Sequence, residues 1–289
     1  MSSTISNQQK ANASDICRSP LIDSFINLKR FLNNLLTNIV ITKTNVGKTF
    51  NYPNGIIKNK LFSNYGIFMD YFIRKHLSNQ YKIDMNDDAV ELVLKQPEIY
   101  FTGNKKRVQN DILQHYKIFK DPSTKAMDTV KSIKIVSLAY TLTFHDPLPK
   151  AEVDSDDAML LEIIKYFKSL PFKKVEMKTN VDCKYFSGNA DLIFSGGEGE
   201  VLYEIKTSQY VTLRRNDVNF SNKNFYKLIL YGFGYYKKTG RIIKTFRIYN
   251  PLLGCTHQIV INNIDFKEFE RCLQEDILNL KFKVMNIKK

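Results

Sequence analysis

The sequence lacks a long apolar run. Of its 289 residues, 43% are hydrophobic, but polar residues interrupt them throughout. No stretch approaches the roughly 20 apolar residues that a helix needs to cross a bilayer. The first fifteen residues, MSSTISNQQKANASD, also lack the apolar segment of a secretory signal. These absences exclude a membrane-spanning protein and predict an intracellular protein that is not secreted.

Cysteine is scarce and scattered. The four cysteines, Cys17, Cys183, Cys255 and Cys272, lie far apart in the sequence. Intracellular compartments keep thiols reduced, so a disulfide framework is not expected. The spacing also argues against a close-spaced metal knuckle or an iron-sulfur cluster. We therefore interpret the four cysteines as packing residues.

Acidic residues are outnumbered by basic ones. The 43 Lys and Arg against 29 Asp and Glu give a formal net charge of +14. A charge of this sign favours a polyanion, and nucleic acid in particular, because phosphates release counterions when Lys and Arg bind them. The chain is also rich in Asn, Lys, Ile and Tyr, which an AT-rich genome would produce by codon bias. The charge alone therefore leaves both explanations open.

Hydrophobic periodicity divides the chain into three parts. We expect a flexible tail over 1–18, a mainly helical region over 19–150 and a strand-bearing core over 151–289. In the second part, Ser19 and Pro20 suit the start of the first helix, and residues 42–60 have the composition of a loop with a short extended piece. Helices are predicted there over 20–40, 61–77, 86–95, 105–119 and 123–142.

The third part predicts a mixed α/β core. An acidic first turn at Asp154–Asp157 precedes the helix-like MLLEIIKYF, and the spacing then changes to a period of two. Three strands forming a meander are predicted from residue 173 through EVLYEIK, with SGGEG as the last turn. A helix from a Ser221 cap to 236, strands over 241–249 and 255–261, and a last helix with an Asp265–Glu268 capping box follow.

Three polar residues in the second and third of these strands are the candidate catalytic and metal-binding residues. Asp191 lies in GNADLIF, and Glu204 and Lys206 lie in YEIKTS. Side chains at i and i+2 project from one face of a strand, so Glu204 and Lys206 should point together while Ile205 enters the core. If SGGEG closes a hairpin, Asp191 lies beside Glu204, and the two carboxylates form a hard oxygen site for Mg²⁺ or Mn²⁺.

Two interpretations of this pattern remain open. In one, the metal lowers the pKa of a bound water and Lys206 positions or deprotonates the nucleophile. In the other, Glu204 and Lys206 form a solvated cross-strand pair and Asp191 closes a turn. The apolar setting of Val201, Leu202 and Ile205 favours the first, because charges are poorly placed there unless they serve each other or a ligand.

The region from about 173 to 261 resembles the PD-(D/E)XK nuclease superfamily, particularly its RecB-like and lambda-exonuclease-like branch. The resemblance rests on GNAD, EIK and KLILYGFGYYKK in this order. It implies a restriction-endonuclease-like mixed central sheet flanked by helices. It also implies that Asp191, Glu204 and the Ile205 carbonyl bind the metal and that Lys206 is the catalytic lysine. The expected activity is hydrolysis of DNA phosphodiester bonds, at DNA ends in replication, recombination or repair, with an exonuclease favoured over an endonuclease.

The chain departs from the family pattern at two positions. Lys227, four residues before Tyr231, stands where the family has Gln, and Ala190 replaces a proline before the first acid. Lys227 can hold a phosphate as a point charge but lacks the donor and acceptor of an amide. For the remaining metal ligand, Asp70, four residues after Gly66, fits the family's first-helix motif, and Glu162 competes with it. The alternative for Asp70 is an ordinary solvent-facing acid.

Substrate contacts are expected near the third strand and the helix that follows. Arg214, Arg215, Lys223 and Lys227 could line a phosphate track, with Tyr231 half-buried beside it, although a solvated helix face would have the same composition. The alternative function is a catalytically inactive nucleic-acid-binding module of the same fold. A third hypothesis is a structural subunit that binds only protein. Oligomeric state is left open.

Overall fold

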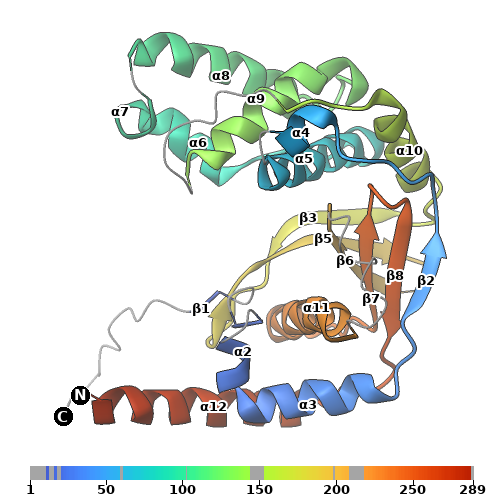
Figure 1. Cartoon of the computed structure of the whole chain (residues 1–289), viewed down its shortest axis with the longest axis vertical. Coiled ribbons are helices and arrows are strands. Elements are labelled where there is room, and N and C mark those ends of the chain that lie inside the picture. Colours follow the sequence, from blue (N-terminus) through green and yellow to red (C-terminus); the bar gives the residue numbers. More distant parts are fainter. Residues whose placement is uncertain are drawn as a thin grey trace.

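The computed structural model describes residues 11–12, 16–17, 21–58, 61–101, 103–143, 153–197, 199–207 and 218–287. A mixed sheet of six strands lies at the centre, and helices cover both of its faces (Figure 1). The described helices are α2 (Leu21–Ser24), α3 (Ile26–Thr37), α4 (Asn54–Lys58), α5 (Phe62–Tyr81), α6 (Asp88–Lys95), α7 (Pro97–Tyr100), α8 (Lys105–Lys120), the 3₁₀ turn η1 (Met127–Thr129), α9 (Val130–Thr141), α10 (Asp157–Lys168), α11 (Val218–Thr239) and α12 (Phe266–Ile287). The described strands are β1 (Ala11–Asn12), β2 (Thr42–Asn45), β3 (Lys174–Asn180), β4 (Phe186–Ser187), β5 (Asn189–Gly196), β6 (Gly199–Ile205), β7 (Thr245–Asn250) and β8 (Cys255–Val260).

The order of strands across the sheet is β2-β8-β7-β6-β5-β3. Strands β3, β5 and β6 form an antiparallel meander, and the β5–β6 turn closes between Gly196 and Gly199, which both have positive φ. Helix α11 then crosses over so that β7 runs parallel to β6, and β8 returns antiparallel to β7. Strand β2, from the first half of the sequence, pairs with β8 and completes the sheet. The sheet is therefore mixed and flanked by helices, as predicted.

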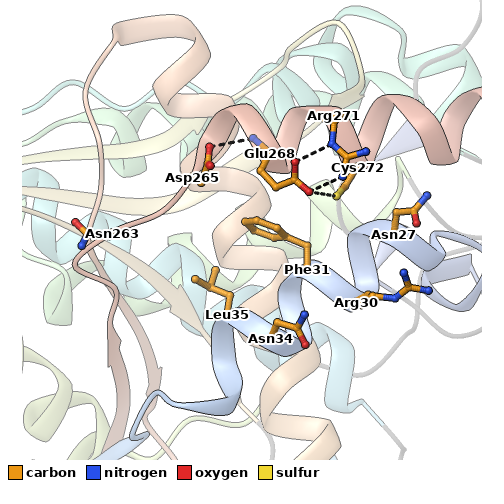
Figure 2. Close-up of a pocket in the computed structure, with 10 residues that line it drawn as sticks. All are labelled: Asn27, Arg30, Phe31, Asn34, Leu35, Asn263, Asp265, Glu268, Arg271 and Cys272. Carbon is orange, nitrogen blue, oxygen red and sulfur yellow. Dashed lines mark hydrogen bonds and ion pairs between the residues drawn. The ribbon is translucent and has the colours of Figure 1, made fainter.

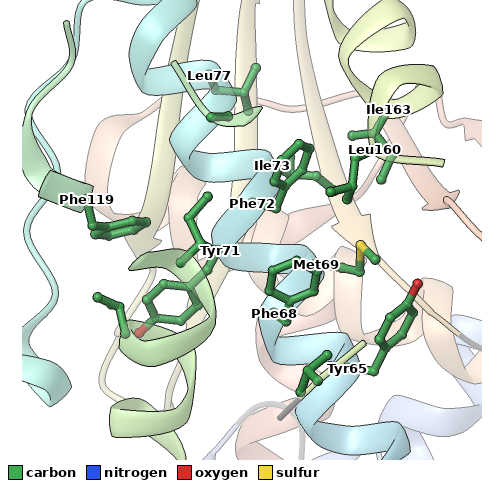
Figure 3. Packing of buried hydrophobic residues seen from close by; sticks show 14 of the residues in the cluster. Tyr65, Phe68, Met69, Tyr71, Phe72, Ile73, Leu77, Phe119, Leu160 and Ile163 are labelled. Carbon is green, nitrogen blue, oxygen red and sulfur yellow. The ribbon is translucent and has the colours of Figure 1, made fainter. Parts of the chain in front are cut away.

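Two hydrophobic clusters lie on opposite faces of the sheet. The first fills the space between the sheet and helices α5 to α10, and α5 forms its centre because Tyr65, Phe68 and Phe72 are all fully buried (Figure 3). The second lies between the sheet and helices α3, α11 and α12 (Figure 1). Strands with large apolar residues on both faces, such as Phe194 and Ile193 of β5, are covered on both sides.

Several predicted helices differ from the observed ones. The expected helix over 20–40 is interrupted, because Phe25 is buried with φ −90° and ψ 69° and separates α2 from α3. Its proposed cap, Ser19, and Pro20 lie outside the described residues. The region over 42–60 contains the expected extended piece, β2, but also the short helix α4. Helix α7 was not expected, and the helix predicted from 123 begins as η1 and continues as α9.

The elements around the polar residues agree better with prediction. Helix α10 begins at an Asp156 cap whose carboxylate accepts hydrogen bonds from the backbone of Ala158 and Met159. Helix α11 starts at Val218, so Ser221 lies inside the helix, and it ends before Gly240 as expected. Asp265 caps α12, whereas Glu268 binds Arg271, so only half of the predicted capping box is formed. Among the helices that the structure describes, none has both the length and the apolar character needed to span a membrane.

Candidate active site

Strands β5 and β6 bring Asp191 and Glu204 to one face of the sheet. The ladder between them pairs Leu192 with Tyr203, and antiparallel register therefore sets Asp191 opposite Glu204. The backbone N–H of Ile205 donates a hydrogen bond of 3.1 Å to Asp191 Oδ2. The side chain of Ile205 packs on the other face, against the α5–α10 cluster. The expected alternation along β6 and the expected hairpin are both present.

Glu204 is buried and binds two lysines through one oxygen. Its Oε1 lies 2.8 Å from Lys206 Nζ and 2.6 Å from Lys227 Nζ. Its Oε2 is buried and has no hydrogen-bond partner. The expected pair of Glu204 with Lys206 is therefore present, but with only 3% of its side chain exposed Glu204 is buried and not solvated. Lys206 is 32% exposed and remains accessible to solvent.

Lys178 of β3 belongs to the same cluster, although no motif in the sequence indicates it. Its Nζ lies 2.8 Å from Asp191 Oδ1 and 3.2 Å from Asp70 Oδ2. Its backbone has φ 49°, in the left-handed region that residues other than Gly, Asn and Asp rarely adopt. Burial by itself would lower the pKa of Lys178, but the two carboxylates outweigh this effect and raise the pKa above its ordinary value.

Two neighbouring lysines, Lys178 and Lys227, stabilise the charged form of Asp191. Burial would raise the pKa of this carboxyl group, but the ammonium groups of Lys178 and Lys227 act more strongly in the opposite direction. Hydrogen bonds from Lys178 and from the Ile205 N–H add to their effect. The pKa of Asp191 is therefore held well below its usual range, and the carboxylate is ionised at neutral pH.

Asp70 reaches the cluster because α5 packs closely against the end of β6. A β-carbon at Gly66 would lie 2.8 Å from Thr207 Oγ1, so the absence of a side chain at Gly66 permits this approach. Asp70 Oδ2 also accepts a 3.1 Å hydrogen bond from Arg74 Nε, and Arg74 in turn pairs with Asp87. Asp70 Oδ1 is buried without a partner.

Glu162, the competing acid, belongs to α10, on the face of the sheet that helices α5 to α10 cover. Its Oε2 is close to Gly47, at 3.3 Å from the position that a β-carbon there would take. No contact between Glu162 and Asp191 or Glu204 is found among the described residues. Of the two candidates, the structure therefore brings Asp70 to the cluster.

The predicted substrate-binding residues have different positions. Lys227 of α11 lies over the ring of Tyr231, with Nζ 5.1 Å from the ring centre, and its ammonium group binds Glu204. Burial would lower the pKa of Lys227, but Glu204 and Asp191 raise it. Tyr231 is buried rather than half-buried. Arg214 and Arg215 lie outside the described residues, as does the side chain of Lys223.

The cluster has the donor chemistry of a magnesium or manganese site. Asp70, Asp191 and Glu204 supply hard carboxylate oxygens, and Asp70 Oδ1 and Glu204 Oε2 are buried without a partner. The ligand atoms of these residues are therefore of the type that binds divalent cations. In the described ranges, however, no three His, Cys, Asp or Glu side chains are grouped so that they could hold a metal ion as they stand. The lysine ammonium groups lie between the carboxylates instead.

A separate pocket of about 370 Å³ lies between α3 and α12 (Figure 2). Phe31 and Leu35 form its apolar wall, and the Glu268–Arg271 ion pair of 2.6 Å lies along its α12 side. None of the predicted site residues lines this pocket. The candidate active site is therefore defined by its charged cluster and not by the pocket in Figure 2.

Comparison of this chain with protein-family models, with curated proteins and with solved structures found no match.

Proposed function

We propose that this chain is a metal-dependent nuclease that hydrolyses phosphodiester bonds of DNA, with a fold of the restriction-endonuclease-like class. The observation that carries the proposal is the convergence of Asp191, Glu204 and Lys206 at one end of the β5–β6 hairpin. The order of β3, β5, β6, α11 and β7 agrees with the family that the sequence resembles. The net charge of +14 supports a nucleic-acid substrate.

Each residue of the cluster has a chemical role in this proposal. Asp191, Glu204 and Asp70 would hold Mg²⁺ or Mn²⁺, with the Ile205 carbonyl as a further ligand. Such an ion, when bound, polarises the phosphate and lowers the pKa of a water. Lys206, partly exposed and directed at Glu204, would position or deprotonate the nucleophile. The Ile205 N–H holds the Asp191 carboxylate in a fixed orientation.

The direct test replaces the proposed catalytic lysine. We expect Lys206→Ala to lose about 100-fold or more of the cleavage of labelled linear DNA with Mg²⁺ or Mn²⁺, since positioned acid–base groups contribute this much. Lys174→Ala is the matched control, because Lys174 lies on β3 of the same sheet and its exposed side chain pairs with Glu176, away from the cluster. A chelator should abolish the wild-type activity. Undiminished cleavage by purified Lys206→Ala would reject the site.

The same assay separates the two modes of attack. We propose action at DNA ends, as an exonuclease, in replication, recombination or repair. An exonuclease should degrade linear duplex DNA and leave a closed circle of the same sequence intact. Cleavage of the circle at a comparable rate would favour an endonuclease.

A second function has support from Lys178 and Lys227. These lysines pair with the carboxylates that a metal would need. A catalytically inactive nucleic-acid-binding module would have such neutralised carboxylates. It should bind DNA in chelator, with an affinity that falls steeply as salt rises, and show no turnover with any divalent metal. Turnover with metal would exclude this alternative.

A further inference from the structure

The charged cluster is formally balanced without any metal ion. Four carboxylates, those of Asp70, Asp87, Asp191 and Glu204, are connected by ion pairs to four basic groups, those of Arg74, Lys178, Lys206 and Lys227. Binding sites for divalent cations depend on an excess of ligand charge. As it stands, this cluster has no such excess.

Two of the ammonium groups bind carboxylate oxygens that are also candidate metal ligands. Lys227 Nζ is 2.6 Å from Glu204 Oε1, and Lys178 Nζ bridges Asp191 and Asp70 at 2.8 and 3.2 Å. A magnesium ion lies about 2.1 Å from its ligand oxygens, so an ion on Glu204 Oε1 would be within about 5 Å of the Lys227 ammonium group. Because like charges at this distance repel strongly in a buried site, the metal and the lysines compete.

The backbone supports this position of Lys178. Strand β3 keeps its register with β5 on both sides, pairing Met177 with Leu192 and Thr179 with Ala190. Only Lys178 between them has a positive φ, and its Nζ reaches Asp191 and Asp70. An unfavourable backbone conformation of this kind persists only where the surroundings impose it, and it is frequent at functional sites.

Both lysine side chains are in partial contact with solvent. The side chain of Lys178 is 38% exposed and that of Lys227 is 17% exposed, so each long side chain has a route to solvent. Glu204 would still keep Lys206, which binds the same oxygen at 2.8 Å. Displacement of the two ammonium groups would leave the carboxylates with a net negative charge.

We propose that Lys178 and Lys227 act as built-in cations of the carboxylate cluster, which a divalent metal ion must displace, so that they weaken metal binding and make it conditional on their release. This inference rests on the proposed metal-dependent function. It assigns to Lys178 and Lys227 a regulatory role at the site.

The test measures Mn²⁺ affinity by calorimetry in the absence of nucleic acid. Two variants remove one charge each: Lys227→Gln on α11, and Lys178→Asn, since Asn tolerates the left-handed backbone at this position. Lys237→Gln is the matched control, because it makes the same change on the same helix where Lys237 pairs with Glu270 at 3.2 Å, away from the cluster. Circular dichroism verifies that each variant is folded, and the Mn²⁺-dependent rise in Tm provides a second readout.

We expect each cluster variant to bind Mn²⁺ at least about threefold more tightly than wild type, and to gain more Tm from Mn²⁺, whereas Lys237→Gln should be unchanged. A smaller gain or a loss of affinity in the folded variants would overturn the inference. If one variant does not fold, the other decides.

The outcomes also separate this inference from the proposed function. Wild-type cleavage combined with unchanged metal affinity in the variants would overturn the inference alone. Tighter metal binding without any cleavage of DNA would leave the inference standing and reject the nuclease. Absence of Mn²⁺ binding in wild type and in all variants would overturn both.

Discussion

Replacement of Lys227 by methionine tests how much the buried ion pair contributes to stability without metal. Lys227 Nζ and Glu204 Oε1 are 2.6 Å apart, with side chains 17% and 3% exposed. At an effective dielectric constant of 20, two unit charges at this distance attract by about 6 kcal/mol, much of which desolvation offsets. Removing one partner of a buried pair costs about 3–5 kcal/mol. Because Lys206 remains 2.8 Å from the same oxygen, we expect the lower end, about 3 kcal/mol.

The assay is urea unfolding at pH 7 with a chelator, followed by circular dichroism. Lys227→Met, Glu204→Gln and the double variant form a cycle, and we expect the double variant to lose about 2 kcal/mol less than the sum of the single variants. Lys237→Met is the control, with an expected loss of at most about 1 kcal/mol because its ion pair with Glu270 is solvent-exposed. Strict additivity, or a loss below about 1 kcal/mol for Lys227→Met, would refute the reasoning.

Three further predictions concern stability elsewhere in the fold. Burial lowers the pKa of His76 from 6.5 to about 4, so the unfolded chain binds a proton at a higher pH than the folded protein, and stability should fall by up to about 3 kcal/mol as pH drops from 6.5 to 4. His76→Gln should remove this part of the pH dependence in unfolding measurements, and an unchanged profile would contradict it. A β-carbon at Gly234 would lie 2.1 Å from the carbonyl oxygen of Val181, so Gly234→Ala should cost about 3 kcal/mol or prevent folding, whereas a wild-type Tm would show that α11 adjusts freely. Phe72→Ala, in the centre of the α5 cluster, should cost about 3–5 kcal/mol in urea unfolding. Leu161→Ala, at a side chain that is 55% exposed, should cost less than about 1 kcal/mol. Equal losses of stability in Phe72→Ala and Leu161→Ala would contradict the assignment of Phe72 to the hydrophobic core.

The chemistry-bearing residues of the hairpin could be predicted because they depend on short-range rules. Alternation along β6 sets Glu204 and Lys206 on one face, and the tight turn between Gly196 and Gly199 sets Asp191 opposite Glu204. The Asp156 cap of α10 is another signal that acts within a few residues. These elements are therefore present as the sequence predicts.

Other members of the cluster could not be predicted from local patterns. Lys178 lies opposite Asp191 only because β3 and β5 pair in one register across the connection that contains β4, and its left-handed backbone has no signal in the sequence. The choice between Asp70 and Glu162 depends on how α5 packs against Thr207. The partner of Lys227 also depends on packing, since α11 and β6 meet only in the folded protein.

By itself, the sequence determined the central hairpin, most helix positions and the acid–lysine pattern, since periodicity, caps and tight turns act between residues that are close along the chain. The break at Phe25, the entry of β2 into the sheet, the burial of Glu204 and the lysines between the carboxylates were decided only by tertiary structure. The physical reason is that burial and ion pairing depend on which distant segments pack together, and a buried carboxylate takes whichever cations that packing brings within reach.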